Sequence, residues 1–333
     1  MQKIRVVISG FGNVGRGVLA SLKNNPDLEL AGIVSRNPAR VRGELGSAAE
    51  VMRTDDVAAW VKAFRPDVAI VCGGSKDDMP KQGPEIAKFV NTVDSFDNHS
   101  RIPEYFKAMD EAAANSGHLS MISSGWDPGI FSLERVLGGA FVPGARAFGF
   151  YGMGPAGGLS MGHSDALRTI PGVRDARQYT HAVPKAVERV RKGENPAFGP
   201  GDMHTRECFV VLEEGADPAA VTKAIVEMPG YFAPYDTTVN FVSMEELRER
   251  CKGFPHDGIV ITSGKTGNGN PALAEYRCVW GSNPEATGNV LVASARAVAR
   301  LAREGRRGAV TVLDIPPAYF TPLSREELLA HWM

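Results

Sequence analysis

The pattern of hydrophobic and polar positions divides this chain into two parts. In the first part, short β-branched runs alternate with segments whose apolar residues recur at helical spacing. We predict strands at 4–9, 28–34, 68–72, 91–94 and 119–123, and helices at 14–24, 55–64, 84–90 and 103–115. Strands that alternate with helices are typical of an α/β fold with a Rossmann-like, doubly wound parallel sheet.

The pattern changes from about residue 130 onward. The stretch 151–163 is rich in glycine and proline and predicts a long loop. Strands are then predicted at 207–212, 237–242 and 258–262 without regular helices between them, which favours an α+β domain with a mixed or antiparallel sheet. The last helix and strand, at 289–303 and 309–313, could return to the first domain. We therefore predict one domain from 1–126 with approximately 284–333, and another from approximately 127–283.

A glycine-rich turn joins the first predicted strand to the first predicted helix. Its sequence is Gly10-Phe11-Gly12-Asn13-Val14-Gly15. Gly10 permits a tight turn, Gly12 lets the backbone approach a pyrophosphate, and Gly15 lets the helix pack closely on the strand. With the N–H groups of the helix N-terminus, this context predicts a dinucleotide site. The alternative is a glycine-rich turn that binds nothing.

The end of the second predicted strand favours one dinucleotide over another. NAD-specific sites place an acidic residue there, against the ribose hydroxyls. This chain has Ser35-Arg36-Asn37, a hydroxyl, a cation and an amide, which suit the 2′-phosphate of NADP better. The alternative is that Arg36 is only a surface arginine. Because the ligand of a doubly wound sheet lies at the carboxyl ends of its strands, we also predict cofactor contacts from Cys72, Gly73, Gly74, Ser75, Thr92, Val93, Asp94, Ser124, Gly125, Trp126, Asp127 and Pro128.

Composition narrows the class of protein further. The 333 residues are 43% hydrophobic and 23% charged, an ordinary globular mixture, and the net charge of −1 gives no argument for nucleic acid or an anionic membrane. No long apolar run predicts a membrane span or a signal peptide. The four cysteines are widely separated and the histidines show no zinc spacing, so we expect no metal site, free thiols and a cytoplasmic protein.

A few polar residues in the predicted turns could carry chemistry. Asp94 and Asp97 follow a strand, and Asp127 lies in a turn fixed by glycine and proline; each could hold a cationic group or accept a proton. Asp127 could equally cap the next helix. Arg206 could clamp a carboxylate or form a surface ion pair, and His256 could be functional or merely solvated.

The chain also resembles the meso-diaminopimelate dehydrogenase family over nearly its whole length and in the same order. The blocks Trp126-Asp127-Pro128-Gly129 and Gly162-His163-Ser164-Asp165 are the most specific ones. The resemblance rests on these blocks and on 10–15, 91–99, 161–167, 170–173, 178–180, 206–211, 255–256 and 283–284.

The resemblance implies an NADP-dependent oxidoreductase of lysine and diaminopimelate biosynthesis. It implies reversible oxidative deamination of the D-centre of meso-2,6-diaminopimelate to L-2-amino-6-oxopimelate, ammonia and NADPH. It also implies a homodimer formed through the second domain. By motif, Asp94 and Asp127 are the catalytic candidates that hold the reacting amino group. The implied substrate contacts are Asp94, Asp127, Trp126, Tyr151, Met161, Thr180, Arg206, His256 and Asn283.

Two positions depart from the family pattern. Tyr151 stands where Trp or Phe is common and is followed by a longer loop at 152–158, and Asn37 stands where a second basic residue is frequent. Two other functions stay open on the residues alone. One is another amino-acid or aldehyde reductase, similar to dihydrodipicolinate reductase or homoserine dehydrogenase, and the other is an NADP-binding sensor without catalysis.

Overall fold

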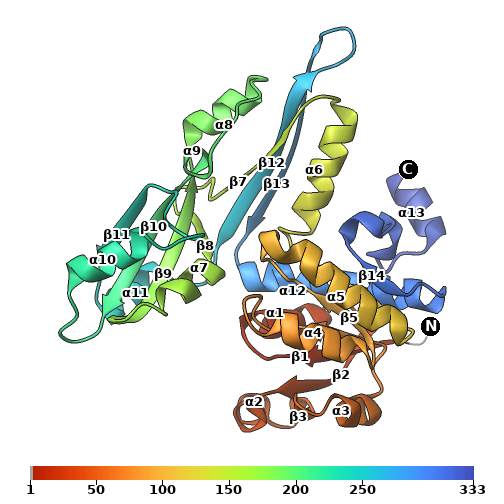
Figure 1. Ribbon diagram of the computed structural model, residues 1–333. Helices are drawn as coiled ribbons and strands as arrows, with labels where there is room; N and C mark the ends of the chain where they lie inside the picture. The colour runs from red at the N-terminus through yellow and green to blue at the C-terminus, as the bar shows by residue number, and fades with distance from the viewer. Residues whose placement is uncertain (1–2) are drawn as a thin grey trace. The chain divides into compact units, whose positions relative to one another are not determined.

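The computed structural model describes residues 3–333, and the chain divides into two compact units (Figure 1). The first unit is Met1–Leu133 with Pro284–Met333, and the second is Glu134–Asn283.

The first unit begins as the hydrophobic pattern predicts, with strands and helices in alternation. Its elements are β1 (Ile4–Ser9), α1 (Asn13–Leu22), β2 (Leu28–Ser35), α2 (Pro38–Leu45), β3 (Val51–Arg53), α3 (Val57–Phe64), β4 (Val68–Val71), α4 (Met79–Ala87), β5 (Asn91–Asp94), α5 (Ile102–Asn115), β6 (Leu119–Met121), α6 (Ile130–Phe141, which ends in the second unit), α12 (Asn283–Arg303), β14 (Gly308–Val310) and α13 (Arg325–Trp332).

Within the described residues, seven strands form one sheet in the order β14-β6-β5-β4-β1-β2-β3, and all of its pairs are parallel. The strand order reverses next to β1, so the sheet is doubly wound, and the predicted fold class is confirmed. One helix boundary was predicted wrongly. We expected a helix to start at Pro84, whereas α4 starts at Met79 and contains Pro84.

The pleat of the central strands explains why helices cover both faces of this sheet. In β1, Val6 and Ile8 point into a core shared with α1 and α12, and Val7 points into a core shared with α3, α4 and α5. Side chains alternate between the faces of a strand, so a run that is apolar throughout must be buried on both sides.

Helix α12 is tied to the first unit by a buried arginine. Arg296 is 1% exposed and forms an ion pair with Asp27, with Nε–Oδ2 at 2.5 Å. Its guanidinium also donates to the side chain of Asn25 and to the carbonyl of Phe320. Burial of a charged group is costly unless it is paired and hydrogen-bonded, and here each nitrogen has an acceptor.

The second unit holds two further sheets. Its elements are β7 (Ala147–Tyr151), β8 (Gly158–Ser160), α7 (Met161–Leu167), β9 (Val173–Ala182), α8 (Pro184–Arg191), α9 (Pro200–Met203), β10 (His204–Leu212), α10 (Pro218–Val226), β11 (Thr237–Phe241), α11 (Met244–Arg250), β12 (His256–Lys265) and β13 (Pro271–Trp280).

One sheet has the order β11-β10-β9-β8 and is mixed, because β10 runs parallel to β11 and antiparallel to β9. The other has the order β13-β12-β7 and is antiparallel. The prediction of a mixed or antiparallel sheet is confirmed. The predicted long loop at 151–163 is wrong in its second half, where β8 and the start of α7 lie, and β9 and β13 were not predicted.

Candidate active site

In the first unit, the turn between β1 and α1 has the close backbone contacts that its glycines predict. Gly10 has φ +96°, and a Cβ there would lie 3.2 Å from the carbonyl oxygen of Cys72. A Cβ on Gly15 would lie 2.3 Å from the carbonyl oxygen of Gly10, so a side chain would push α1 off the turn. Both positions therefore need glycine.

The N-terminus of α1 faces open space at Gly12. Gly12 is the N-cap residue, no side chain caps the first turn, and a Cβ at this position would meet no atom within 4 Å. Uncapped N–H groups and the positive end of the helix dipole favour an anion. A cavity of about 390 Å³ begins here, so the residues fit the pyrophosphate of a dinucleotide.

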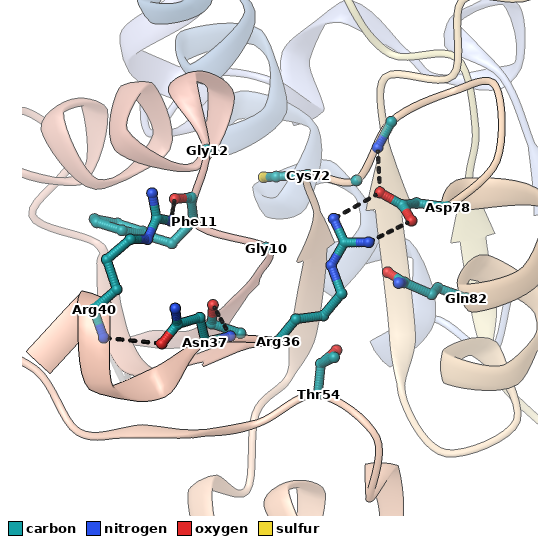
Figure 2. A pocket seen from close by; sticks show the side chains of 13 residues that line it. Gly10, Phe11, Gly12, Arg36, Asn37, Arg40, Thr54, Cys72, Asp78 and Gln82 are labelled. Atoms are coloured by element: carbon teal, nitrogen blue, oxygen red, sulfur yellow. Dashed lines mark hydrogen bonds and ion pairs between the residues drawn. The ribbon is translucent and has the colours of Figure 1, made fainter.

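Figure 2 shows this cavity, which gathers eight of the predicted cofactor residues. They are Gly10, Gly12, Ser35, Arg36, Asn37, Cys72, Gly73 and Gly74. Sequence reasoning did not select five other lining residues, which are Phe11, Arg40, Thr54, Asp78 and Gln82. Arg40 lies in the first turn of α2, four residues after Arg36, and donates to the carbonyl of Phe11 at 2.8 Å. Arg40 therefore adds a second cation to the cavity, where position 37 has the neutral Asn37 in place of a basic residue.

Ser35 and Asn37 have local roles that limit what they offer a cofactor. The Asn37 side chain caps α2 by accepting from the Arg40 backbone N–H at 3.1 Å. The Ser35 hydroxyl accepts from the Asn37 backbone N–H at 3.2 Å. Arg36 and Arg40 are thus the cationic groups of the cavity lining.

Other predicted cofactor residues lie outside this cavity. Of the predicted residues in the glycine turn, those that do not line the cavity are Asn13, Val14 and Gly15. The Ser75 hydroxyl accepts from the Asp97 backbone N–H at 3.1 Å. Thr92 and Val93 are 0% exposed, and Thr92 donates to the Ser120 hydroxyl inside the sheet. Both side chains lie in the core, and the prediction that Thr92 and Val93 contact the cofactor stays a prediction.

Asp94 is placed differently from what its motif suggested. Its side chain is 0% exposed; Oδ1 accepts from the backbone N–H groups of Phe96 (2.9 Å) and Ser123 (3.1 Å), and Oδ2 accepts from the Tyr105 hydroxyl (2.8 Å). Burial raises the pKa of Asp94 to about 6, and these three hydrogen bonds oppose the rise. The carboxylate joins the ends of β5 and β6 and is enclosed. Asp97 is the exposed carboxylate of this segment.

The turn from Ser124 to Pro128 is tightly folded. The Gly125 N–H donates to the Pro128 carbonyl at 2.8 Å, and the Asp127–Pro128 peptide is cis. Trp126 packs edge-on against Phe131, with ring centroids 5.2 Å apart. Ser124 is buried and its hydroxyl lies 2.5 Å from that of Ser294. Asp127 is half-buried, directly before α6.

In the second unit, β9 and β10 place Thr180 opposite Arg206. The Arg206 guanidinium donates to the Thr180 hydroxyl and lies over the Tyr235 ring, 4.0 Å from its centroid. Arg206 is 8% exposed, its Nε has no hydrogen-bond partner, and within residues 3–333 no carboxylate forms an ion pair with it. A desolvated cation in this state requires an anion.

Two histidines, His163 and His204, lie near enough to this guanidinium for its charge to act on them. The Nε2 atom of His204 accepts from the Tyr151 backbone N–H at 3.0 Å, and its ring stacks on that of Tyr151 at 5.2 Å. Burial, with smaller contributions from Arg206 and His256, lowers the pKa of His204 and of His163 to about 3, so both imidazoles are neutral. His256 lies 6.4 Å from Tyr151, ring to ring. The structure thus brings Tyr151 and Arg206 close to His204, which sequence reasoning did not select. Thr180 bonds Arg206, and His256 lies beside Tyr151.

Asn283 and Met161 complete the predicted set. The Asn283 side chain donates to the Leu159 carbonyl at 3.4 Å, and its backbone N–H donates to the Phe254 carbonyl at 2.7 Å. Leu159 and Met161 flank Ser160, whose hydroxyl caps α7.

His204 and Arg206 are two residues apart on β10, so their side chains lie on the same face of the strand. This spacing was the sequence signal that could have identified His204.

No group of three His, Cys, Asp or Glu residues that could hold a metal ion occurs within residues 3–333. None of the helices in that range is both long and apolar enough to cross a membrane.

A doubly wound sheet with an open glycine turn is typical of the class of dinucleotide-binding proteins. Residues 125–282 match the model of the diaminopimelic acid dehydrogenase C-terminal domain. The chain is 49% identical to the meso-diaminopimelate D-dehydrogenase of Lysinibacillus sphaericus and 48% identical to that of Ureibacillus thermosphaericus, with 98% of each chain covered in both comparisons.

Solved structures agree. The C. glutamicum DAP dehydrogenase in complex with DAP matches with a TM-score of 0.92 at 39% identity, with 100% of both chains covered. An engineered D-amino acid dehydrogenase bound to NADP⁺ matches with a TM-score of 0.89 at 38% identity, again over 100% of both chains. The chain belongs to the meso-diaminopimelate D-dehydrogenase family and is an oxidoreductase of that type.

Proposed function

We propose that this enzyme catalyses the reversible, NADP-dependent oxidative deamination of meso-2,6-diaminopimelate at its D-configured carbon. The products are L-2-amino-6-oxopimelate, ammonia and NADPH, which places the enzyme in diaminopimelate and lysine biosynthesis. When bound, NADP⁺ accepts the hydride from that carbon. The names of its relatives and their bound DAP and NADP⁺ support this proposal.

The observation that carries the proposal is the buried guanidinium of Arg206. A substrate carboxylate would supply the missing anion, and the planar fork of arginine suits a carboxylate. Thr180, which bonds the same guanidinium, and His256 and Asn283 offer further polar contacts. We assign these residues to the distant L-centre, whose fixation selects the D-centre for reaction.

In the first unit, we assign Asp127 to the reacting amino group. Asp97, not Asp94, is the second carboxylate that we propose for this contact, because Asp94 is enclosed and its oxygens already accept three hydrogen bonds. The amine must lose a proton before it is oxidised, and either of these two carboxylates can accept that proton, directly or through water. Asp94 then positions the segment that carries Asp97.

The preference for NADP over NAD is a proposal based on the cations of the cavity. Arg36 and Arg40 line it, and no acidic residue ends β2. A guanidinium pair favours the 2′-phosphate over a ribose diol. We also propose a cytoplasmic homodimer. The free state of Cys72, Cys208, Cys251 and Cys278 supports the reducing compartment, and the family resemblance supports the dimer through the second unit.

Formation of NADPH, followed by absorbance with the meso, LL and DD isomers, tests the reaction and its stereochemistry. We expect turnover of the meso isomer and none of the LL isomer, which lacks a D-centre. Absence of turnover with the meso isomer would contradict the proposed substrate. Equal rates with NAD and NADP would contradict only the assignment of Arg36 and Arg40.

A further inference from the structure

The cation predicted to select NADP is already paired with a carboxylate. Arg36 follows β2, and Asp78 directly precedes α4; both line the cavity of the glycine turn (Figure 2). The Arg36 Nη1 and Nη2 atoms lie 3.1 and 3.3 Å from Oδ1 and Oδ2 of Asp78, so the contact uses both oxygens. The Arg36 side chain is 73% exposed and that of Asp78 is 26% exposed.

The two partners are anchored unequally. Asp78 Oδ2 also accepts from the Gly74 backbone N–H at 3.3 Å, which ties it to the glycine loop after β4. Among the described residues, Arg36 bonds no acceptor other than Asp78. Arg40, by contrast, donates to the Phe11 carbonyl. The guanidinium is therefore the partner that can change acceptors.

A 2′-phosphate competes for this guanidinium. Carboxylate and phosphate oxygens both bind the fork of arginine in the same bidentate manner. An exposed ion pair contributes little stability, so a phosphate with a larger charge can displace Asp78.

We propose that Asp78 is a specificity-determining residue of the cofactor cavity, whose carboxylate pairs with Arg36 and thereby weakens the binding of a 2′-phosphorylated dinucleotide. This inference rests on the proposed use of NADP. NAD carries a hydroxyl in place of the 2′-phosphate, so Asp78 does not oppose it in this way. The residue thus lowers the preference for NADP over NAD.

The chain provides a matched control in Asp77, the exposed neighbour of Asp78, which makes no contact with Arg36. Asp78→Asn and Asp77→Asn remove the same charge from adjacent positions, and in Asp78→Asn the side-chain amide oxygen can still accept from the Gly74 N–H. Binding of NADPH and NADH to each full-length variant is measured by fluorescence titration, together with KM and kcat for NADP and NAD.

We expect Asp78→Asn to tighten NADPH binding by about two- to five-fold, within the range that exposed ion pairs span, and to change NADH binding by less. Asp77→Asn should change NADPH binding by less. The effect of Asp78→Asn should vanish in an Arg36→Met background, because it acts through Arg36. An equal effect of the two Asn variants, weaker NADPH binding in Asp78→Asn, or persistence of the gain without Arg36 would overturn the inference.

These outcomes are separate from a failure of the proposed function. A wild-type enzyme that binds NADH as tightly as NADPH would contradict the proposed cofactor preference, on which this inference rests. A wild-type enzyme that prefers NADPH, with Asp78→Asn indistinguishable from Asp77→Asn, would contradict the inference alone.

Discussion

The hydroxyl of Tyr105 donates a 2.8 Å hydrogen bond to Oδ2 of Asp94 inside the first unit, where Asp94 is 0% and Tyr105 4% exposed. Tyr105 belongs to α5, and Asp94 ends β5. The pair closes off a carboxylate that would otherwise be available at the strand end. Burial and the neighbouring carboxylate also raise the pKa of Tyr105 well above its usual value, so the hydroxyl keeps its proton and stays a donor.

Replacing Tyr105 with Phe should destabilise the enzyme by about 1–3 kcal/mol, because it leaves one oxygen of a buried carboxylate without its donor. Urea unfolding measures this loss. Tyr319→Phe is the matched control, since the Tyr319 hydroxyl bonds the exposed Glu304 carboxylate at 2.7 Å, and its effect should stay within roughly 0.5 kcal/mol. Equal effects of the two variants would contradict the buried role of the Asp94–Tyr105 pair.

The raised pKa of Asp94 predicts a pH dependence of stability. In the folded enzyme this pKa is about 6, above the ordinary 3.8, so the folded state holds the proton more tightly than the unfolded state does. The corresponding stabilisation is complete below about pH 4 and is lost as the pH rises towards 6. The free energy of unfolding of wild type minus that of Asp94→Asn should therefore fall over this window.

The comparison with Asp94→Asn cancels the contributions that other titrating groups make to the free energy of unfolding. His163 and His204 have pKa values lowered to about 3, and their contributions have the opposite sign: they are present above pH 6.5 and lost as the pH falls. They cancel in the difference between the two proteins. A difference that does not change between pH 4 and 6 would show that the environment of Asp94 does not raise its pKa.

Mutation of the three candidate carboxylates Asp94, Asp97 and Asp127 should distinguish residues needed for activity from a residue needed for stability. Asp127→Asn should lower kcat/KM by about 10²–10⁴-fold, the usual range for a lost proton acceptor, without a matching loss of stability. Asp97→Asn should also lower kcat/KM with stability retained, whereas Asp94→Asn should alter stability. Steady-state kinetics and urea unfolding of the three variants measure this. A large loss of activity in Asp94→Asn at unchanged stability would restore Asp94 as the substrate contact.

Arg206→Met should reduce kcat/KM for meso-diaminopimelate roughly 30-fold or more, which corresponds to the 2 kcal/mol or more carried by a buried charge contact. It should leave the free energy of unfolding unchanged or higher, because it removes a buried cation that lacks a carboxylate partner. This opposition between activity and stability is typical of a binding residue.

Arg177→Met is the control for that variant. Arg177 lies on β9, and its guanidinium pairs with Asp175 at 2.7 Å, so its charge is already balanced. We expect its kcat/KM within about two-fold of wild type, because Arg177 already has a carboxylate partner and is not assigned to the substrate. An equal loss of activity in Arg206→Met and Arg177→Met would contradict the proposal that Arg206 binds the substrate because it lacks a carboxylate partner.

The sequence predicted the parallel sheet well because buried parallel strands are apolar throughout, as Val68–Val71 is. Strand β9 was missed because Arg174, Asp175 and Arg177 interrupt its apolar pattern. Strand β13 was missed because apolar Leu273 and Val279 share a face with charged residues, so its apolar and polar positions do not alternate. In both, neighbouring strands, not the local pattern, decide the conformation.

Candidate residues were predictable as a set but not in their orientation. Asp94 and Asp97 lie at the end of the same strand. The tertiary contacts from the Tyr105 hydroxyl and the Ser123 N–H determine that the Asp94 carboxylate is the enclosed one. Similarly, Arg36 was predictable from its place after β2, whereas its pairing with Asp78 joins residues 42 positions apart. Such contacts depend on the strand order, which the sequence pattern does not specify.

The central claim is that oxidation takes place at the D-configured carbon of meso-diaminopimelate. Two samples of this substrate, one deuterated at the D-centre α-carbon and the other at the L-centre α-carbon, test it directly, with mass spectrometry of the NADPH formed. The account predicts deuterium in the reduced cofactor from the first sample and none from the second. Deuterium from the L-centre sample, or from neither sample, would contradict it.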